Sequence, residues 1–531
     1  MRRVLVPALA AAVGLTAIGL ARGAVIVGTP GPDRLIGTSR ADELYGLGGN
    51  DPLTGRGATD LIDGGPGRDR LSGGPGPDRI AANDRQVDTV LCGSARDLVV
   101  ADRVDRVSTD CETVSRQLSR DTGTDFEAQH ETQVEPHSFA YGRTMVTVFQ
   151  SGRFENGGAE RIGFATSRDG GRTWHSGRLP GSFERVSDPI VVYDSVHRWW
   201  IATSLASEEA VGVNRSRDGI SWRAPLLVSS NGQEYDKEWI ACDNWPRSTF
   251  RGRCYLSYMN FANDTIETRR STDGGATWSE PFSVDAQRAP AGVNGVQIAV
   301  RPNGHVMLVF SVWGSPFHTE NEIGAVRSTD GGVSFSAPTH ATALGGTELP
   351  WLRSPPFTSV DVDAAGTIYV TWRECGFSAD CQGDIVLMRS PDGVTWSTPV
   401  SVPIGPEDGS LFYFLPALAV DPATAGPRAR LALLYHSMGP SRTCDPAYGC
   451  FQVDAKLTTS ANGGSTWTRP QQLNAFPMLP AWMADTSLGR MLGDYVSVSW
   501  SRGRPVPVWS LASSPGGAPY RQAIFATTRL G

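Results

Sequence analysis

The segment GGPGRDRLSGGPGPDRIA, residues 64–81, consists of two copies of a nine-residue unit placed end to end. Each copy has glycine at its first, second and fourth positions, aspartate at its sixth and a large aliphatic residue at its eighth. The aspartate and the aliphatic residue recur at every ninth position between residues 28 and 81. They are Asp33, Asp42, Asp51, Asp60, Asp69 and Asp78, with Leu35, Leu44, Leu53, Ile62, Leu71 and Ile80. A short fixed period indicates stacked structural repeats.

The residue types of the unit favour a calcium site. Glycine permits positive φ, so the first six residues suit a turn that presents backbone carbonyls and one carboxylate. These are the hard oxygen ligands that Ca²⁺ prefers. The unit resembles the RTX nonapeptide Gly-Gly-x-Gly-x-Asp-x-U-x, where U is a large aliphatic residue. The resemblance implies a small parallel β-roll over residues 28–81, with Ca²⁺ as its cofactor and the six aspartates as metal ligands.

Several copies depart from the RTX pattern. Arg40 and Ala58 stand where a glycine is expected, and Pro52 interrupts the third short strand. The alternative is therefore a β-roll that has lost much of its calcium affinity. Asp60, Asp69 and Asp78 are the strongest candidate ligands.

Residues 1–23 are typical of a secretory signal peptide. Arg2 and Arg3 precede an apolar run, and small residues follow at a predicted cleavage site. The alternative is an uncleaved membrane anchor, which the short run disfavours. We predict a secreted protein with no stable membrane insertion after cleavage.

The eight cysteines form four close pairs in the sequence, as expected for disulfides in an exported chain. The pairs are Cys92/Cys111, Cys242/Cys254, Cys375/Cys381 and Cys444/Cys450. Zinc is the alternative, but the pairs lie in different repeats. We expect residues 82–115 to form a cap closed by the first pair, and residues 116–132 a linker that supplies a closing strand.

A second pattern, Ser-x-Asp-(x)-Gly-x-Ser/Thr-aromatic, occurs six times in the rest of the chain. The copies are residues 167–174, 216–222, 271–278, 328–335, 390–396 and 460–467. Asp followed by Gly favours a turn in which the carboxylate accepts hydrogen bonds from nearby amides. The aromatic residue then packs the turn against its own sheet.

These six turns resemble the Asp-box (BNR) repeats of sialidase-like β-propellers. The resemblance implies an all-β fold in which residues 133–531 form an Asp-box β-propeller, preceded by the small parallel β-roll. Seven first-strand segments favour seven blades, and six is the alternative. The seventh blade lacks a fourth strand, which residues 126–133 are expected to supply.

Polar residues cluster at the starts of the predicted first strands. They are Glu135, His137, Asp188, Asp236, Lys237, Glu238, Asn294, Tyr413, Arg490, Asp494 and Tyr495. Loops between later strands add Arg153, Arg373 and Glu374. We expect these residues to face one rim of the disc, as a ligand site or as a merely solvated surface.

Sialidases bind a sugar carboxylate with three arginines and use a tyrosine nucleophile activated by a glutamate. The resemblance therefore implies candidate catalytic residues, although no position matches a family motif residue by residue. They are Arg353, Arg373 and Arg490 as the triad, Asp494 and Asp236 as acids, and Tyr495 (or Tyr413) as nucleophile with Glu238 (or Glu374) as its partner.

The 531-residue chain has a formal net charge of −7, which argues against nucleic acid as a partner. One hypothesis is a secreted calcium-binding protein that binds extracellular carbohydrate or glycoprotein and cleaves it as an exo-sialidase-like glycoside hydrolase. The alternatives are a non-catalytic protein that binds a glycan or a surface protein, and a structural adhesin.

Overall fold

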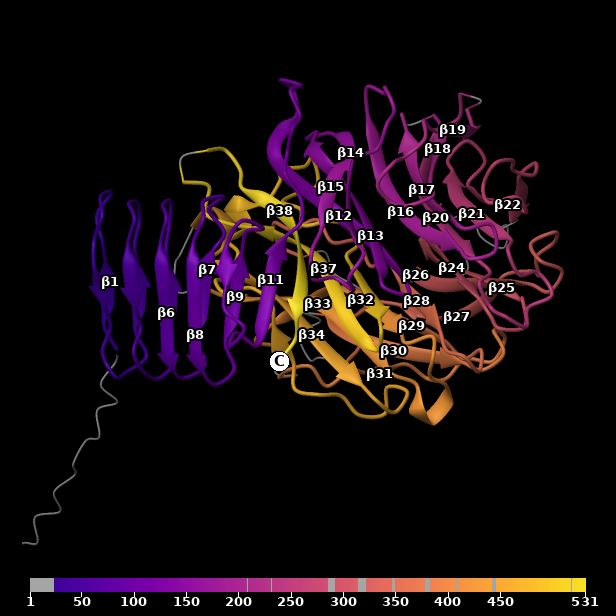
Figure 1. The fold of residues 1–531 in the computed structure, drawn as a ribbon. Helices are drawn as coiled ribbons and strands as arrows, with labels where there is room; N and C mark the ends of the chain where they lie inside the picture. The colour runs from indigo at the N-terminus through magenta and orange to yellow at the C-terminus, as the bar shows by residue number, and fades with distance from the viewer. Residues whose placement is uncertain are drawn as a thin grey trace, which may run out of the picture.

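The structure is a computed structural model that describes residues 23–531 except residues 208, 231, 285–291, 314–320, 346–348, 378–382, 407–408, 442–445 and 517. The regular secondary structure of the described residues is almost entirely β-strand (Figure 1). The helical elements among them are three single 3₁₀ turns, Gly426–Arg428, Pro446–Tyr448 and Pro480–Trp482. The predicted signal peptide lies outside the described residues, apart from Gly23.

The N-terminal part is a β-solenoid, in which stacked coils form two parallel sheets. One sheet contains β1 (Val25–Val27), β3 (Glu43–Tyr45), β5 (Leu61–Asp63), β7 (Arg79–Ala82), β9 (Leu98–Ala101) and β11 (Thr113–Gln117). The other contains β2 (Leu35–Ile36), β4 (Pro52–Thr54), β6 (Arg70–Pro75), β8 (Thr89–Ser94) and β10 (Arg106–Val107). Two nine-residue units make one coil, because each strand pairs with the second strand before it.

The aliphatic residues of the repeat fill the solenoid, as the sequence predicts. Leu44, Leu53, Ile62, Leu71 and Ile80 are all fully buried. Their side chains form one interior column together with residues of the later coils, including the disulfide-bonded Cys92 and Cys111. Each buried leucine or isoleucine contributes roughly 1.5–3 kcal/mol, which offsets the entropy lost by ordering the turns.

The remaining strands run antiparallel in sequence order, in successive sets. The first two sets are β12 (Gln129–Tyr141), β13 (Thr144–Arg153), β14 (Ala159–Ser167), β15 (His175–Arg178), and β16 (Val186–Asp194), β17 (Trp199–Ala206), β18 (Val211–Ser216), β19 (Leu226–Ser229). The next two are β20 (Tyr235–Cys242), β21 (Cys254–Asn260), β22 (Thr265–Ser271), β23 (Phe282–Val284), and β24 (Gly292–Val300), β25 (Val306–Trp313), β26 (Asn321–Ser328), β27 (Thr339–Leu344).

Two further four-stranded sheets and a three-stranded set complete the chain. The sheets are β28 (Ser359–Val362), β29 (Ile368–Glu374), β30 (Asp384–Ser390), β31 (Val400–Ser401), and β32 (Phe412–Val420), β33 (Leu431–Pro440), β34 (Phe451–Ser460), β35 (Gln471–Gln472). The last set is β36 (Ser497–Ser501), β37 (Arg504–Ala512) and β38 (Gln522–Arg529).

Strand β11 joins the solenoid to the last set. On one side it pairs in parallel with β9, and on the other it pairs antiparallel with β38. Strand β38 also meets β12 at one bridge, Thr132 to Gln522. As a result, solenoid strands, the first two antiparallel sets and the last set belong to one hydrogen-bonded sheet of 17 strands.

This continuity corrects the predicted fold class. The prediction of an Asp-box β-propeller of seven (or six) blades behind a small β-roll is wrong, because the solenoid is not a separate roll: its strands share one sheet with the first two antiparallel sets and the last set. It is an all-β protein built on a β-solenoid of stacked coils that continues by hydrogen bonding into the first two antiparallel sets and the last set. The turn motifs specify local hairpins, but they carry no information about how one sheet is joined to the next.

The six Ser-x-Asp turns have the local geometry that their chemistry predicts. In the first, Asp169 Oδ1 accepts hydrogen bonds from the backbone amides of Arg172 and Thr173, both at 2.9 Å. The Trp174 indole donates to the carbonyl of Gly171 at 2.9 Å. The other five turns repeat the amide bonds to the side chain at the third position, which is Asn462 in the last turn.

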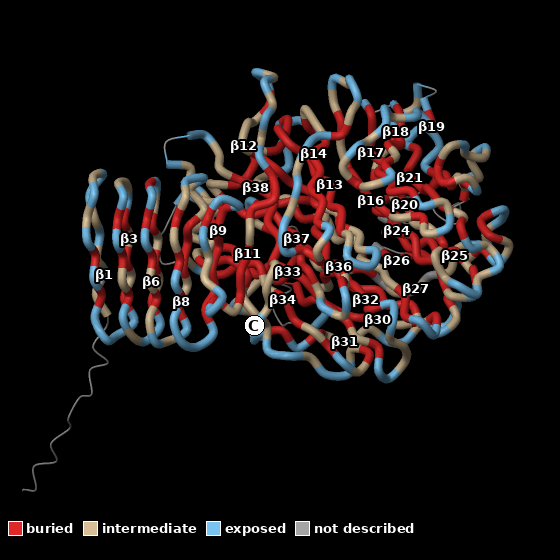
Figure 2. The backbone as a smooth tube through the Cα atoms, viewed as in Figure 1, coloured by how far each residue is buried: buried red, intermediate tan, exposed pale blue. Residues whose placement is uncertain are grey.

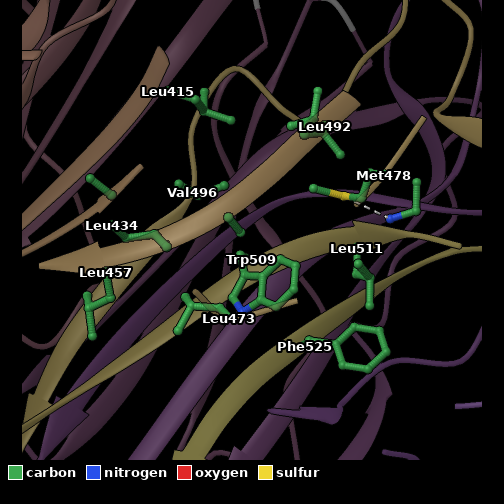
Figure 3. Close-up of a cluster of buried hydrophobic side chains, with 14 of the residues drawn as sticks. Leu415, Leu434, Leu457, Leu473, Met478, Leu492, Val496, Trp509, Leu511 and Phe525 are labelled. Carbon is green, nitrogen blue, oxygen red and sulfur yellow. Dashed lines mark hydrogen bonds between the residues drawn. The ribbon is translucent and has the colours of Figure 1, made fainter. Parts of the chain in front are cut away.

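The largest hydrophobic core lies where the solenoid meets the C-terminal strands (Figure 2). It includes Trp509 and Phe525 of the last set and Leu473, which follows β35 (Figure 3). Two residues of the solenoid sheet, Ala81 and Val100, belong to the same core. The two parts of the chain therefore share buried apolar surface as well as a strand.

The disulfides Cys92–Cys111 and Cys242–Cys254 are present, as predicted. Of the other two predicted pairs, Cys381 and Cys444 lie outside the described residues. Within the described part of the chain, no helix is long and apolar enough to cross a membrane.

Candidate functional site

Five of the antiparallel sets carry a bulge at the same place in their first strand, and in the first three sets a charged residue stands at it. The pairing with the second strand shifts register near Glu135 in β12, near Asp188 in β16 and near Lys237 in β20. Each of these residues has a left-handed backbone, with φ of 53°, 49° and 50° respectively. Bulges re-aim side chains, and left-handed conformations are costly for residues other than glycine. The bulge thus sets the direction in which these three side chains leave their strands.

The three side chains converge on the Lys237 ammonium group. Its Nζ donates to Asp188 Oδ1, lies 2.8 Å from Asp494 Oδ2 and lies 3.6 Å from Glu135 Oε1. All four residues are at most 8% exposed. A buried cation paired with three carboxylates satisfies charges that would otherwise be very costly to bury. We call Glu135, Asp188, Lys237, Arg353 and Asp494 the Lys237 cluster.

Arg353 completes this cluster from a segment far away in the sequence. Its Nε and Nη2 donate to the two carboxylate oxygens of Asp494, at 2.9 Å and 2.6 Å. The backbone amide of Asp494 donates in turn to Glu135 Oε1 at 3.2 Å. Gly493 precedes it at φ 149°, where a Cβ would lie 3.1 Å from the Glu135 nitrogen. A side chain at residue 493 would therefore push the two acidic residues apart.

The surroundings in the Lys237 cluster shift the pKa values of Glu135 and Asp494 in opposite directions. Burial raises the pKa of Glu135 to about 7, against the opposing effect of Lys237. Burial also acts to raise the pKa of Asp494, but Lys237 and Arg353 hold it below its ordinary value. Burial raises the pKa of Asp236, which accepts a hydrogen bond from Asn294. Near neutral pH the site thus combines an ionised Asp494 with Glu135, a carboxyl group that is then only partly ionised.

A pocket of about 230 Å³ opens beside the cluster. Its charged and polar lining residues are Glu135, Gln150, Arg153, Arg185, Ser187, Asp188, Ser207, Glu234, Tyr235, Asp236, Lys237 and Arg353, and its apolar ones include Phe261. Arg153 is 2% exposed and donates from Nη1 to the amide oxygen of Gln150, while its Nε is buried without a hydrogen-bond partner among the described residues. An unpaired buried donor of this kind is costly unless a ligand or a water molecule accepts a hydrogen bond from it.

The structure brings together three of the candidate catalytic residues. Asp494 and Arg353 belong to the Lys237 cluster, and Asp236 lines the same pocket.

Glu238 and Tyr495 line a neighbouring cavity of about 480 Å³ with largely apolar walls, which shares Lys237 with the pocket. Both carboxylate oxygens of Glu238 are buried without a partner among the described residues, and burial raises its pKa well above the ordinary value. The Tyr495 hydroxyl donates to the Pro189 carbonyl at 3.2 Å.

The three arginines of the predicted triad contact different partners and do not share one site. Arg490 donates from Nε and Nη2 to the Tyr448 hydroxyl, at 3.0 Å and 2.6 Å, and Arg373 donates to the Ser354 carbonyl at 3.5 Å. Only Arg353 of the three lines the pocket, and the other arginines there are Arg153 and Arg185. Glu135, Asp188 and Lys237 stand at predicted strand starts, and their recurrence in successive repeats is the signal that could have singled them out.

The solenoid turns form a second candidate site. On each edge of the stack, the backbone amide of one aspartate donates to the Oδ1 of the aspartate one coil later. The pairs Asp33–Asp51 and Asp51–Asp69 follow one edge, and Asp42–Asp60 and Asp60–Asp78 the other, all at 2.7–2.8 Å. The second carboxylate oxygens of Asp51, Asp60, Asp69 and Asp78 are buried and have no hydrogen-bond partner in the described part of the chain.

These turns fit Ca²⁺. Burial raises the pKa of Asp60 to about 6, and of Asp69 and Asp78 to about 7 each. Buried carboxylates with an unpaired oxygen need a cation, and hard oxygen donors suit Ca²⁺. Asp33 and Asp42 differ, because Thr29 and Thr38 already donate to their carboxylates. Among the described residues, no three acidic, histidine or cysteine side chains are arranged so that they alone could hold a metal ion, so main-chain carbonyls must supply further ligands.

Comparison with known families agrees with this assignment. Residues 27–62 and 45–80 match the family described as RTX calcium-binding nonapeptide repeat (4 copies). This part of the chain consists of RTX calcium-binding repeats, and Ca²⁺ is its cofactor. RTX repeats and disulfides are typical of extracellular proteins.

Among curated proteins, none matches the sequence significantly. Solved structures with a distantly similar fold include an ulvan lyase of a new polysaccharide lyase family, at 12% identity over 76% of this chain and 95% of that chain, TM-score 0.47. An α-L-arabinofuranosidase from Fusarium graminearum is 15% identical over 65% of this chain and 97% of its own, with a TM-score of 0.41. The Hadza microbial sialidase Hz136 is 13% identical over 78% of this chain and 92% of its own, with a TM-score of 0.41. At these values the likenesses carry no argument about activity.

Proposed function

We propose that this calcium-binding protein is secreted and binds an anionic carbohydrate in the pocket beside the Lys237 cluster. The observation that carries the proposal is Arg153, a buried guanidinium that lines the pocket with an unpaired Nε. A guanidinium matches the geometry of a carboxylate or sulfate group, so an acidic sugar would supply the missing acceptor.

The charge balance of the pocket supports an anionic ligand. Four cationic residues line it, namely Arg153, Arg185, Lys237 and Arg353. Four acids line it too, but burial raises the pKa of Glu135 to about 7, so this carboxyl group carries less than a full negative charge near neutral pH. The difference leaves positive potential for an anionic group.

The pocket also offers apolar contact for a sugar ring. Phe261 is 41% exposed and lies among the lining residues. Its ring presents a flat apolar surface next to polar groups, a combination found in small-molecule sites. Sugar hydroxyls would then bind the amide of Gln150 and the carboxyl groups.

The test is binding of uronate-containing oligosaccharides by calorimetry, with neutral oligosaccharides of equal length as the comparison. Arg153→Gln is expected to weaken binding of the acidic ligand at least tenfold. Arg490→Gln is the matched control, because Arg490 does not line the pocket. Equal binding of acidic and neutral sugars, or equal loss in both variants, would contradict the proposal.

Glycoside hydrolysis is a second candidate function, which the separated pKa values of Glu135 and Asp494 favour. Glu135 would donate a proton to the leaving oxygen, and ionised Asp494 would stabilise positive charge at the sugar. A panel of fluorogenic glycosides tests this role with wild type and Glu135→Gln. Turnover that Glu135→Gln abolishes would support it, whereas binding without turnover would favour a non-catalytic carbohydrate-binding protein.

A further inference from the structure

The acidic edge of the solenoid continues beyond the residues that match RTX repeats. The amide of Asp78 donates to Asp97 Oδ1 at 2.8 Å, as each earlier aspartate on that edge does to the next. Asp97 is 1% exposed, and its Oδ2 is buried without a partner among the described residues. The turn at residues 92–97 therefore places a buried, unpaired carboxylate oxygen where the matched turns place theirs.

The backbone of this turn keeps the conformation of the matched repeats. Gly93 and Ala95, its second and fourth residues, have φ of 109° and 111°. The corresponding residues of the preceding turn on this edge, Gly74 and Gly76, have φ of 111° and 135°. Ala95 has a positive φ that alanine rarely adopts. The stacked coil therefore imposes the turn geometry even where alanine replaces the glycine of the repeat.

The oxygen atoms of the turn also have the same arrangement. A Cβ built on Gly73 would lie 2.3 Å from Asp78 Oδ2 and 2.7 Å from the carbonyl oxygen of Cys92. One coil earlier, a Cβ built on Gly55 would lie 2.2 Å from Asp60 Oδ2 and 2.9 Å from the carbonyl oxygen of Gly73. The pairing of a carboxylate oxygen with a carbonyl of the next coil thus repeats, with Cys92 in the place of a glycine.

We propose that the turn at residues 92–97 is a further calcium-binding turn, which holds Ca²⁺ with Oδ2 of Asp78 and Asp97 and the main-chain carbonyl of Cys92. The Cys92–Cys111 disulfide holds the first residue of the turn to the next coil. Asp78 and Asp97 both line a cleft of about 740 Å³ between the solenoid and the C-terminal strands, so the ion can enter from solvent.

The first experiment counts bound ions in the purified full-length protein by equilibrium dialysis against ⁴⁵Ca²⁺. Asp97→Asn is expected to bind one ion fewer than wild type, as is Asp60→Asn in a matched repeat. Asp264→Asn, which changes an exposed aspartate of the β21–β22 turn, is expected to bind the full number. An undiminished count for Asp97→Asn, alongside the loss in Asp60→Asn, would overturn the proposal.

A second experiment leaves all the proposed calcium ligands unmutated. Arg96→Trp puts an indole in the turn, where it would sensitise luminescence of bound Tb³⁺, and Arg68→Trp does so at the equivalent position of a matched repeat. Both variants are expected to gain emission that excess Ca²⁺ removes, whereas Arg178→Trp on β15 gains none. Emission from Arg68→Trp without emission from Arg96→Trp would overturn the proposal, even if Asp97→Asn fails to fold.

Discussion

Arg353 holds Asp494 through two hydrogen bonds, from Nε to Oδ1 at 2.9 Å and from Nη2 to Oδ2 at 2.6 Å. The two residues are 141 positions apart in the sequence. Forked pairs of this kind are the strongest charge-assisted hydrogen bonds in proteins, and they fix orientation as well as charge. The pair fixes Asp494 beside Lys237, and so it determines the shape of the candidate site.

We expect this pair to be energetically coupled. In a double-mutant cycle of Arg353→Met and Asp494→Asn, the coupling energy from urea unfolding should be roughly 1.5–3 kcal/mol. The same cycle on the exposed pair Arg168 and Asp218, 3.4 Å apart, should give less than about 1 kcal/mol. Additive effects at Arg353 and Asp494 would show that the observed pairing contributes nothing.

Lys237→Met should destabilise the protein by about 3–5 kcal/mol, because it leaves Glu135, Asp188 and Asp494 buried without their common cation. The measurement is the shift of the urea midpoint at constant m-value. Arg168→Met removes an exposed cation and should change the free energy of unfolding by less than about 1 kcal/mol. A similar small change for Lys237→Met would mean that water already solvates the cluster.

Glu135 should make stability depend on pH. Burial raises its pKa from 4.5 to about 7, so the folded protein keeps this proton where the unfolded chain has lost it. Its contribution to stability is therefore present below pH 4.5 and is lost as the pH rises through 7. Glu135→Gln does not titrate, so the stability difference from wild type should change by on the order of 3 kcal/mol across this range.

The control for that pH series is Glu184→Gln, which removes one exposed carboxylate and reports the effect of net charge alone. Its difference from wild type should stay nearly constant between pH 4.5 and 7. A constant difference for Glu135→Gln as well would mean that Glu135 ionises in the folded protein as it does in the unfolded chain.

Calcium removal should destabilise both parts of the chain, because β11 pairs with β9 of the solenoid and with β38 of the last set. Binding to the folded form alone contributes RT ln(1 + [L]/Kd), or about 2.7 kcal/mol per site at a hundredfold excess over Kd. Calorimetry with and without a chelator should show the whole unfolding profile move to lower temperature. If the antiparallel sheets unfolded at the same temperature with and without the chelator, the shared strand β11 would not couple their stability to that of the solenoid.

Local structure was predictable wherever a short motif specifies it. The nine-residue period predicts the turns, the inward aliphatic column and the Ca²⁺ cofactor, since each unit contains the turn residues and a carboxylate, and stacked copies bring the ligands together. The Asp-x-Gly pattern predicts the amide bonds to Asp169 for the same reason. Cysteines that lie close in the sequence, such as Cys242 and Cys254, were likewise paired correctly.

The fold class and the site depend on contacts that no local pattern records. The sequence determined that the chain starts as a calcium-binding stack and continues as hairpins with Ser-x-Asp turns. Only the tertiary structure decided that β11 belongs to both regions, which overturned the predicted propeller with its separate roll. It also brought Arg353 rather than Arg373 or Arg490 to Asp494, because long-range pairing depends on how sheets pack and not on the spacing of residues along the chain.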